Sequence, residues 1–298
     1  MPEAVAGGGR VRDAPISTMR GREAPISPMR VRDALEMARA RLAEAGCDTP
    51  RLDAELLLAA ALGVDRARLV VDALRVLDEA ALERFGALVA RRADREPVAY
   101  ILGHKEFRRL SLAVDRRVLI PRPETELLVE VGLSLETGAR VADVGTGSGA
   151  VALALKDERP DLVVVGTDSS QDAITVAREN ARRLGLDVSF LCADLLDGVT
   201  GPVDAVLANL PYVAEGARGS LPPEITAFEP ASALFAGPDG LEVVRRLVRA
   251  VDHVSLIALE VGFDQGAAVA RLLDGVGFGR VDRLRDLAGH ERVIVGHR

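Results

Sequence analysis

The sequence is poor in the residues that mark several specialised classes of protein. Its only two cysteines, Cys47 and Cys192, lie far apart, so neither a disulfide framework nor a cysteine-rich metal site is expected. The four histidines show no metal-ligand spacing, and we predict no bound metal. The longest apolar stretch, residues 56–64, is too short to span a bilayer, which takes about 20 residues. We therefore expect a reduced, cytoplasmic protein that does not enter a membrane.

An excess of positive charge is also missing. The net charge is −7, so the sequence does not predict a broad basic surface for nucleic acid. Apolar residues make up 48% and charged residues 28% of the chain, a composition typical of a globular protein with a substantial core. Its 298 residues are enough for about two ordinary domains.

The first residues differ from the rest of the chain. Residues 14–20 return almost unchanged as residues 24–30, and this segment has no amphipathic period and little to bury. We predict a disordered extension over residues 1–29, with the folded protein beginning near Met29.

Three regions follow this extension. Residues 30–95 have helical apolar periodicity, which predicts a small helical bundle. In residues 96–121 short apolar runs, at 107–114 and 118–120, predict a hairpin linker. In residues 122–298 strand and helix patterns alternate, which indicates a parallel, doubly wound sheet. The strands are expected at residues 140–144, 162–167, 188–192, 205–208 and 254–260, and near residues 281 and 293.

A glycine-rich turn follows the first strand of that sheet. Gly145, Gly147 and Gly149 allow tight backbone geometry and close approach of a ligand to backbone N–H groups. Asp168 follows at the end of the second strand, about 20 residues on, where a carboxylate can bind ribose hydroxyls. The combination predicts a nucleotide-type cofactor site.

The turn alone does not distinguish S-adenosylmethionine from a nicotinamide dinucleotide, because Gly145, Gly147 and Ala150 also satisfy the dinucleotide spacing. Asp143 favours S-adenosylmethionine, since a carboxylate here would repel a pyrophosphate but attract an ammonium and a sulfonium. Asp194, after the third strand, would then accept a hydrogen bond from the adenine amino group. A solvated turn acid is the alternative for Asp194.

The acceptor tetrad, Asn209-Leu210-Pro211-Tyr212, follows the fourth strand. Ligands of doubly wound sheets bind at the carboxyl ends of the strands, so the tetrad should face the methyl group of the cofactor. The Asn209 carbonyl oxygen and a backbone carbonyl would accept the two N–H bonds of a planar amide and stabilise the charge that grows on it. Pro211 stiffens the turn, and the Tyr212 ring would stack on the flat acceptor. A plain turn with a core tyrosine is the alternative.

Several segments together resemble a known family, the glutamine methyltransferases that modify peptide chain release factors. The resemblance covers about residues 31–298, and its most specific segment is residues 118–126, VLIPRPETE. Residues 97–103, PVAYILG, with Phe107 are similar to the linker of that family. Further matches are residues 228–230, 239–241 and 260–265.

The resemblance implies a class I S-adenosylmethionine-dependent methyltransferase fold. Its mostly parallel sheet would have seven strands, with one antiparallel member among the last. The reaction would move a methyl group from S-adenosylmethionine, leaving S-adenosylhomocysteine, to N5 of the glutamine in the Gly-Gly-Gln loop of a class 1 release factor. The helical domain would recognise that partner.

The resemblance also assigns site residues by position. The cofactor would be bound by Gly145, Thr146, Gly147, Ser148, Gly149, Asp168, Asp194, Leu195 and Asn209, together with Asp143. The glutamine would be bound by the acceptor tetrad, of which Asn209, Pro211 and Tyr212 would be catalytic. Arg122 and Glu124 belong to a segment, residues 122–126, that would cover the methionine end of the pocket or simply close the domain junction.

One departure leaves other functions open. The family usually has proline where this chain has Leu210, and Asn-Leu-Pro-Tyr is also similar to the tetrad of ribosomal RNA adenine N6-methyltransferases. Those enzymes carry their extra domain after the cofactor motif, whereas here the helical region precedes it. A catalytically silent binding module and a nicotinamide oxidoreductase are the alternatives from other classes.

Overall fold

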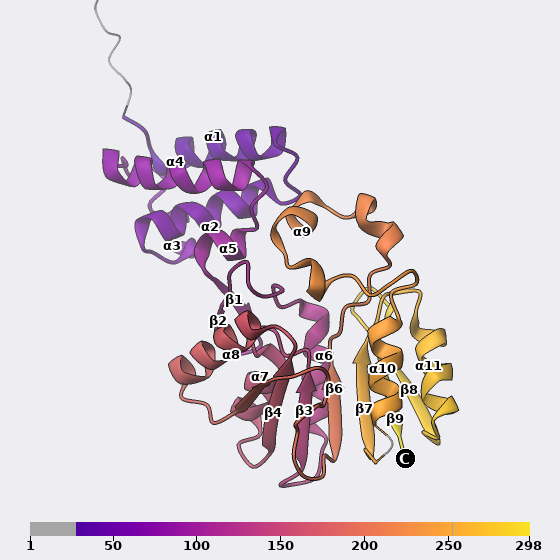
Figure 1. Cartoon of the computed structure of the whole chain (residues 1–298). Helices are drawn as coiled ribbons and strands as arrows, with labels where there is room; N and C mark the ends of the chain where they lie inside the picture. The colour runs from indigo at the N-terminus through magenta and orange to yellow at the C-terminus, as the bar shows by residue number, and fades with distance from the viewer. Residues whose placement is uncertain (1–27, 252) are drawn as a thin grey trace, which may run out of the picture.

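The structure, a computed structural model, describes residues 28–251 and 253–298. Of the extension predicted over residues 1–29, all but the last two residues lie outside this part of the chain. A helical unit comes first and a layered sheet unit follows it (Figure 1). Met29, expected at the end of the extension, already packs against the helical core. Its carbonyl oxygen accepts the N–H of Leu77 at 2.9 Å.

Helices lie within residues 30–95, where the apolar periodicity predicts them, and one further short helix follows this range. The helices of the helical unit are α1 (Val31–Glu44), α2 (Pro50–Leu62), α3 (Arg66–Val71), α4 (Glu79–Ala93) and α5 (Val98–Leu102). Pro50 occupies the first position of α2, where a missing N–H costs no helical hydrogen bond. Asp78 caps α4 by accepting the N–H of Ala81 at 2.7 Å. Buried Leu42, Leu57 and Phe85 join the helices in one core.

A hairpin lies within residues 96–121, the range in which the sequence predicts a hairpin linker. Strands β1 (His104–Phe107) and β2 (Leu110–Ala113) form an antiparallel pair. The residues before them form helix α5, whose Ile101 packs into the helical core. Residues 118–120, expected to be extended strand, pair with no strand in the part of the chain that the structure describes. Instead the Val118 carbonyl oxygen accepts the hydroxyl of Tyr100 at 2.6 Å, so a side chain from α5 satisfies it.

The second unit is built on a seven-stranded sheet with the order β5-β4-β3-β6-β7-β9-β8. The strands are β3 (Arg140–Val144), β4 (Val163–Asp168), β5 (Ser189–Cys192), β6 (Ala205–Ala208), β7 (Leu256–Glu260), β8 (Arg280–Arg285) and β9 (Glu291–His297). Neighbours from β5 to β7 are parallel, whereas β9 runs antiparallel to β7 and β8. The predicted doubly wound fold with one antiparallel member is confirmed.

Helices cover both faces of the sheet (Figure 1). One face packs against α6 (Glu126–Leu133), α7 (Ala150–Glu158) and α8 (Gln171–Leu184), and the other against α10 (Glu242–Ala250) and α11 (Gly266–Gly275). Successive strand residues point to opposite faces, so Val141 of β3 belongs to the first core and Ala142 to the second. Burial on both faces explains why these strands read as continuous apolar runs.

An insert, residues 213–236, connects the acceptor tetrad to α10. Its two ends meet where Val213 bridges Phe235, and it carries the short helix α9 (Pro223–Phe228). In Figure 1 this helix lies beside the helical unit rather than over the sheet. The insert therefore reaches from the end of β6 back to the other unit.

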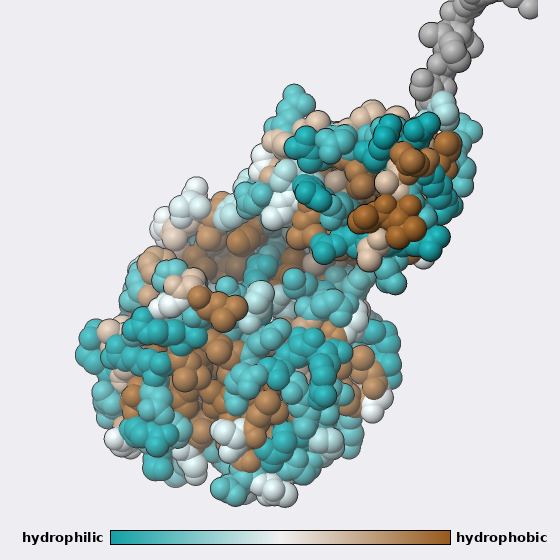
Figure 2. All heavy atoms as spheres, turned by 180° about the vertical axis from the view of Figure 1, so that it is seen from behind, coloured by the Kyte–Doolittle hydropathy of each residue, from teal (hydrophilic) through white to brown (hydrophobic). Residues whose placement is uncertain are grey.

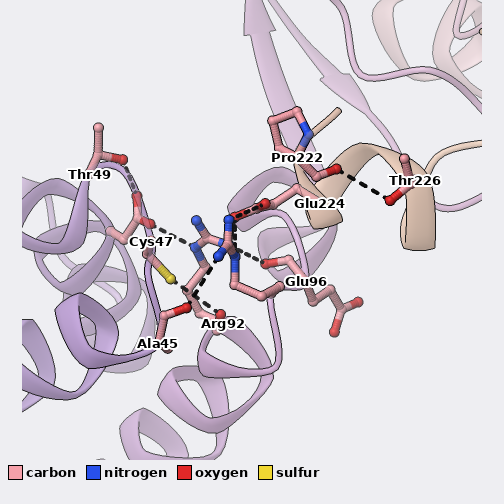
Figure 3. Close-up of polar contacts among 10 residues, drawn as sticks. Ala45, Cys47, Thr49, Arg92, Glu96, Pro222, Glu224 and Thr226 are labelled. Atoms are coloured by element: carbon pink, nitrogen blue, oxygen red, sulfur yellow. Dashed lines mark hydrogen bonds and ion pairs between the residues drawn. The ribbon is translucent and has the colours of Figure 1, made fainter. Parts of the chain in front are cut away.

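A cluster of ion pairs joins the insert to the helical unit (Figure 3). Arg92 Nη1 lies 2.9 Å from Glu224 Oε1, and Arg95 Nη2 lies 2.6 Å from Glu224 Oε2. The Nε atom of Arg92, a residue only 5% exposed, also donates to Asp53 of α2 at 2.7 Å. A buried guanidinium is tolerated when its N–H groups have charged partners, so these contacts hold the two units together.

The surface of the helical unit has an apolar part. Val70, Val71 and Leu74 are 80%, 74% and 62% exposed. Figure 2 shows hydrophobic residues on the surface of this unit among hydrophilic ones. Exposed apolar groups of this kind often mark interaction sites. Within the described part of the chain, no helix is long and apolar enough to cross a membrane.

Candidate active site

The glycine-rich turn after β3, residues 145–149, is tied to the neighbouring strand. The N–H groups of Gly145 and Thr146 both donate to the carbonyl oxygen of Thr167 in β4, each at 2.9 Å. Gly145 has φ +76°, and a Cβ atom there would lie 3.1 Å from the carbonyl oxygen of Asn209. Glycine therefore allows the turn and the acceptor tetrad to approach each other closely.

Asp168 ends β4 and is oriented by the same turn. Its Oδ2 accepts the N–H of Gly147 at 3.0 Å, and its Oδ1 accepts the N–H of Ser170 at 2.9 Å. Each oxygen keeps a further lone pair for a hydroxyl donor. Burial raises the pKa of Asp168 above its usual 3.8, although the two backbone bonds limit the rise. This arrangement fits a ribose-binding carboxylate.

Asp143 lies beneath the turn and is 2% exposed. Its Oδ2 accepts the Thr146 hydroxyl at 2.6 Å and the Ala152 N–H at 3.1 Å. Both bonds go to one oxygen, which leaves Oδ1 for a ligand in the pocket that Asp143 lines. Burial raises the pKa of Asp143 to about 6, and the bonds from Thr146 and Ala152 oppose the rise. An ionised Asp143 at neutral pH fits the cationic methionine part of S-adenosylmethionine.

The residues predicted at the adenine lie after β5. The carboxylate of Asp194 pairs with Arg246 of α10, and both residues line the pocket. An adenine amino group would therefore share Asp194 with a guanidinium. Leu195 has φ +52°, a conformation that costs a non-glycine residue about 1 to 3 kcal/mol. Its carbonyl oxygen accepts the Thr167 hydroxyl at 2.6 Å, and this bond stabilises the turn.

One pocket brings most of the predicted residues together. It opens at the carboxyl ends of β3, β4 and β6, where the strand order reverses, the usual ligand position in this fold. Its lining includes Asp143, Gly145, Thr146, Gly147, Ser148, Asp168, Asp194, Leu195, Asn209, Leu210 and Pro211. Four predicted residues do not line it: Gly149, Tyr212, Arg122 and Glu124.

Two of these four have other contacts in the structure. Gly149 has φ +84° at the start of α7, and a Cβ atom there would lie 2.9 Å from Cδ1 of Leu153. The glycine is thus needed for helix packing. Arg122 pairs with the buried carboxylate of Glu229 in the insert. This contact ties residues 122–126 to the insert.

The acceptor tetrad rests on a chain of hydrogen bonds. Asn209 Nδ2 donates to Thr125 Oγ1 at 3.0 Å, and the Thr125 hydroxyl donates to Glu260 Oε2 at 2.6 Å. The Tyr212 hydroxyl donates to Glu260 Oε1 at 3.3 Å. Glu260 ends β7 and is 2% exposed. Burial raises its pKa to about 7, while the bonds from Thr125 and Tyr212 oppose the rise.

The backbone of the tetrad is held from the other side. The Tyr212 carbonyl oxygen accepts Nε2 of Gln265 at 2.9 Å. Gly240, with φ +74°, lies against the same carbonyl, since a Cβ atom there would lie 2.1 Å from the oxygen. Leu210, in the place of the usual proline, is buried in the core with α10 and α11. Its side chain therefore packs into the protein, and its backbone carbonyl remains in the tetrad.

The sequence analysis assigned no role to several residues that the structure places here. They are Glu260 and Arg246, with Pro230, Ser232 and Ala233 of the insert. Glu260 had a detectable signal, because it is an acid at the end of a buried strand, as Asp168 is. Arg246 and the insert residues had none, since their approach to the pocket depends on tertiary packing.

Comparison with known proteins identifies the family. Residues 33–103 match the PrmC N-terminal domain, and residues 123–225 match the methyltransferase small domain. The release factor glutamine methyltransferase of Caulobacter vibrioides is 39% identical over 269 residues, 87% of this chain and 93% of that protein. That of Moorella thermoacetica is 42% identical over 276 residues, 89% of this chain and 97% of that protein. The chain belongs to the release factor glutamine methyltransferase family.

A solved structure agrees with the fold of this family member. The hMettl16 catalytic domain, in complex with MAT2A 3′UTR hairpin 6, matches with a TM-score of 0.55 over 70% of this chain and 81% of that chain. At 17% identity this match shows the fold alone. The family relationship does not favour the alternative of a ribosomal RNA adenine methyltransferase.

Proposed function

We propose that this chain transfers a methyl group from S-adenosylmethionine to the side-chain amide nitrogen, N5, of the glutamine in the Gly-Gly-Gln motif of class 1 peptide chain release factors. One observation carries the proposal: the glycine-rich turn, Asp168 and Asn209 line one pocket. Asp168, which we assign to the ribose, and Asn209, which we assign to the acceptor amide, thus line the same cavity. Relatives that are named release factor glutamine methyltransferase support this substrate.

The chemistry assigned to the chain is mainly orientation. An amide nitrogen is a weak nucleophile, because its lone pair is delocalised into the carbonyl group. Asn209 Oδ1 and a backbone carbonyl of the tetrad accept its two N–H bonds, which aligns the nitrogen and stabilises its developing positive charge. Pro211 offers no N–H that would compete for these acceptors. Bound S-adenosylmethionine supplies the electrophilic methyl group.

The proposal also assigns a role to each part of the chain. Residues 30–95 recognise the release factor, residues 96–121 form the link, and residues 122–298 carry out methyl transfer. The exposed apolar side chains of the helical unit support a recognition role, because partner proteins bind such surfaces. The protein would act in the cytoplasm, where release factors work.

Mass spectrometry of a release factor incubated with this protein and S-adenosylmethionine tests the proposal. We expect one added methyl group, on the glutamine of the Gly-Gly-Gln motif. Asn209→Ala should abolish it. A ribosomal RNA fragment serves as the comparison substrate. Methylation of the RNA with an unmodified release factor would reject the proposal.

A further inference from the structure

A buried carboxylate lies beneath the acceptor tetrad with no partner of opposite charge within ion-pair distance among the described residues. Glu260 comes from the end of β7, whereas Thr125 comes from the short 3-10 helix Pro123–Thr125. Thr125 is 4% exposed and lies between Glu260 and Asn209. Burying an unpaired carboxylate is costly, so its position at a site for a planar amide points to a function there.

The number of available protons fixes the direction of these hydrogen bonds. An ionised Glu260 only accepts, so the single proton of the Thr125 hydroxyl must point toward it. The Thr125 oxygen can then only accept, and it accepts from the NH2 group of Asn209. The Asn209 amide is thereby oriented with its nitrogen toward Thr125, and Oδ1 is the atom left for a ligand in the pocket.

We propose that Glu260 and Thr125 are positioning residues for methyl transfer, which orient the Asn209 amide so that its oxygen, and not its nitrogen, receives the acceptor amide of the substrate. This inference rests on the proposed function, because only an N–H-bearing acceptor requires an oxygen at this position. Without the hydrogen-bond chain from Glu260 through Thr125, the two flipped orientations of the Asn209 side-chain amide would differ little in energy. A flipped amide would present its NH2 group to the N–H groups of the substrate.

Protonation of Glu260 removes the constraint. A neutral Glu260 can donate to Thr125, and the Thr125 hydroxyl can then donate to a flipped Asn209. The groups that act on Glu260 are the hydroxyls of Thr125 and Tyr212, the carboxylate of Glu124 and the guanidinium of Arg292. Burial raises the pKa of Glu260 to about 7, so the ionised, correctly oriented form prevails above that pH and is lost below it.

Tyr212 uses the other oxygen of the same carboxylate. Its hydroxyl donates to Oε1 while Thr125 donates to Oε2. Burial raises the pKa of Tyr212 well above its usual 10, so the hydroxyl keeps its proton. Glu260 therefore contacts both ends of the acceptor tetrad, directly at Tyr212 and through Thr125 at Asn209. The Tyr212 bond is longer, so we expect the Thr125 branch to dominate.

The kinetics of three variants test the hydrogen-bond chain from Glu260 through Thr125 to Asn209. Thr125→Val keeps the shape but removes the hydroxyl, and Glu260→Gln keeps the shape but removes the charge. Each should lower kcat about tenfold to a hundredfold, by analogy with the loss of one oriented group in an active site. S-adenosylhomocysteine affinity should be unchanged in Glu260→Gln, because Glu260 does not line the pocket. Thr125→Ser restores the hydroxyl and should restore most of kcat.

The pH profile separates positioning from packing. With S-adenosylmethionine saturating, the wild-type kcat/KM for the release factor should fall on the acid side with an apparent pKa near 7, and Glu260→Gln should lack this limb. Asp53→Asn is the matched control, because it neutralises another buried carboxylate, in the helical unit. It should lower the melting temperature and leave the acid limb in place. The double variant, Thr125→Val with Glu260→Gln, should be no slower than either single variant.

A direct readout does not depend on the substrate. The side-chain NH2 signals of Asn209 in 1H–15N spectra, assigned by their loss in Asn209→Asp, should shift between pH 6 and 8 in the wild type. They should not shift in Glu260→Gln. Signals that move equally in both proteins, or full activity of Thr125→Val, would overturn the inference. A wild type that shows the shift but leaves the release factor unmodified would reject the proposed function alone.

Discussion

Nη2 of Arg95, just beyond the end of α4, lies 2.6 Å from Oε2 of Glu224 in α9, across the junction between the helical unit and the sheet unit. Arg95 has φ +69°, and its Nη1 donates to the Ala45 carbonyl oxygen at 3.2 Å. A non-glycine residue keeps such a backbone conformation only where its surroundings impose it. The junction is therefore a constrained contact, and it holds the insert whose residues 230–233 reach the pocket.

Glu224→Gln should weaken this junction. The buried guanidinium of Arg92 would lose a charged partner, and we expect a loss of about 1 to 3 kcal/mol in the free energy of unfolding. Burial alone would raise the pKa of Glu224, but the bonds from Arg95 and Arg92 bring it below its usual 4.5. The stabilisation of the folded protein by the ionised Glu224 is therefore complete above pH 4.5, and it is lost as the pH falls through the lowered pKa of Glu224. Thermal unfolding at pH 7 and at pH 4 measures both effects.

The same variant tests coupling between the units. The KM for a whole release factor should rise, because the helical unit and the insert would no longer be held in fixed positions. S-adenosylhomocysteine affinity should change little. Glu215→Gln is the control on the same insert, since its pair with Arg218 is exposed and 3.7 Å long. Equal effects of the two substitutions would contradict a special role for the junction.

Asp168→Asn should weaken cofactor binding with little change in fold. One side-chain oxygen would remain, so only one of the two backbone bonds, from Gly147 or Ser170, could persist. Loss of charge-assisted hydrogen bonds should lower S-adenosylhomocysteine affinity by about 1.5 to 3 kcal/mol, roughly tenfold to a hundredfold. Isothermal titration calorimetry measures this affinity directly. Asp172→Asn, an exposed acid in the first turn of α8, should bind normally.

The cofactor half of the site could be predicted from sequence because its parts are local. Gly145 and Gly147 follow a strand and Asp168 ends one, and parallel strands bring their carboxyl ends to one edge of the sheet. The strands themselves were recognisable from continuous apolar runs. Gly149 shows the limit of this reasoning. A side chain at this position would clash with Leu153 in the next helical turn, and a sequence motif does not reveal that contact.

The contacts beneath the tetrad could not be predicted in the same way. Thr125 and Asn209 are 84 residues apart, and Thr125 and Glu260 are 135 apart, so only the packed fold shows that they touch. Helix α5 was missed because its five residues are too few to display a helical period. The junction at Glu224 depends on the path of the insert, for which the sequence has no periodic signal.

Cofactor affinity should depend on pH through Asp143. Burial raises its pKa to about 6, so the carboxylate becomes protonated as the pH falls through that value. A neutral Asp143 attracts a cationic ligand less, and S-adenosylmethionine affinity should fall below pH 6. Titration calorimetry between pH 5 and 8 measures this. Asp143→Asn should bind weakly at every pH, and a steep pH dependence that survived in it would assign the effect to another group.

Gly240→Ala should impair methyl transfer by displacing Tyr212. Both Gly240 and Gly138 have a positive φ, +74° and +77°, so alanine at either position should cost about 1 kcal/mol in strain. Only at Gly240 would the new Cβ meet an atom, the Tyr212 carbonyl oxygen at 2.1 Å. Among the described residues, none has an atom within 4 Å of the corresponding position at Gly138, which makes Gly138→Ala the matched control.

Comparison of these two variants separates the effect of displacing the tetrad from the effect of backbone strain. Gly138→Ala should lower the melting temperature slightly and keep the wild-type kcat. Gly240→Ala must move a backbone carbonyl, so the bond from Gln265 to Tyr212 should break and kcat should fall about a hundredfold. Cofactor affinity should persist in both, because Gly240 does not line the cofactor pocket. Equal kcat values in folded samples of the two variants would show that transfer tolerates a displaced tetrad.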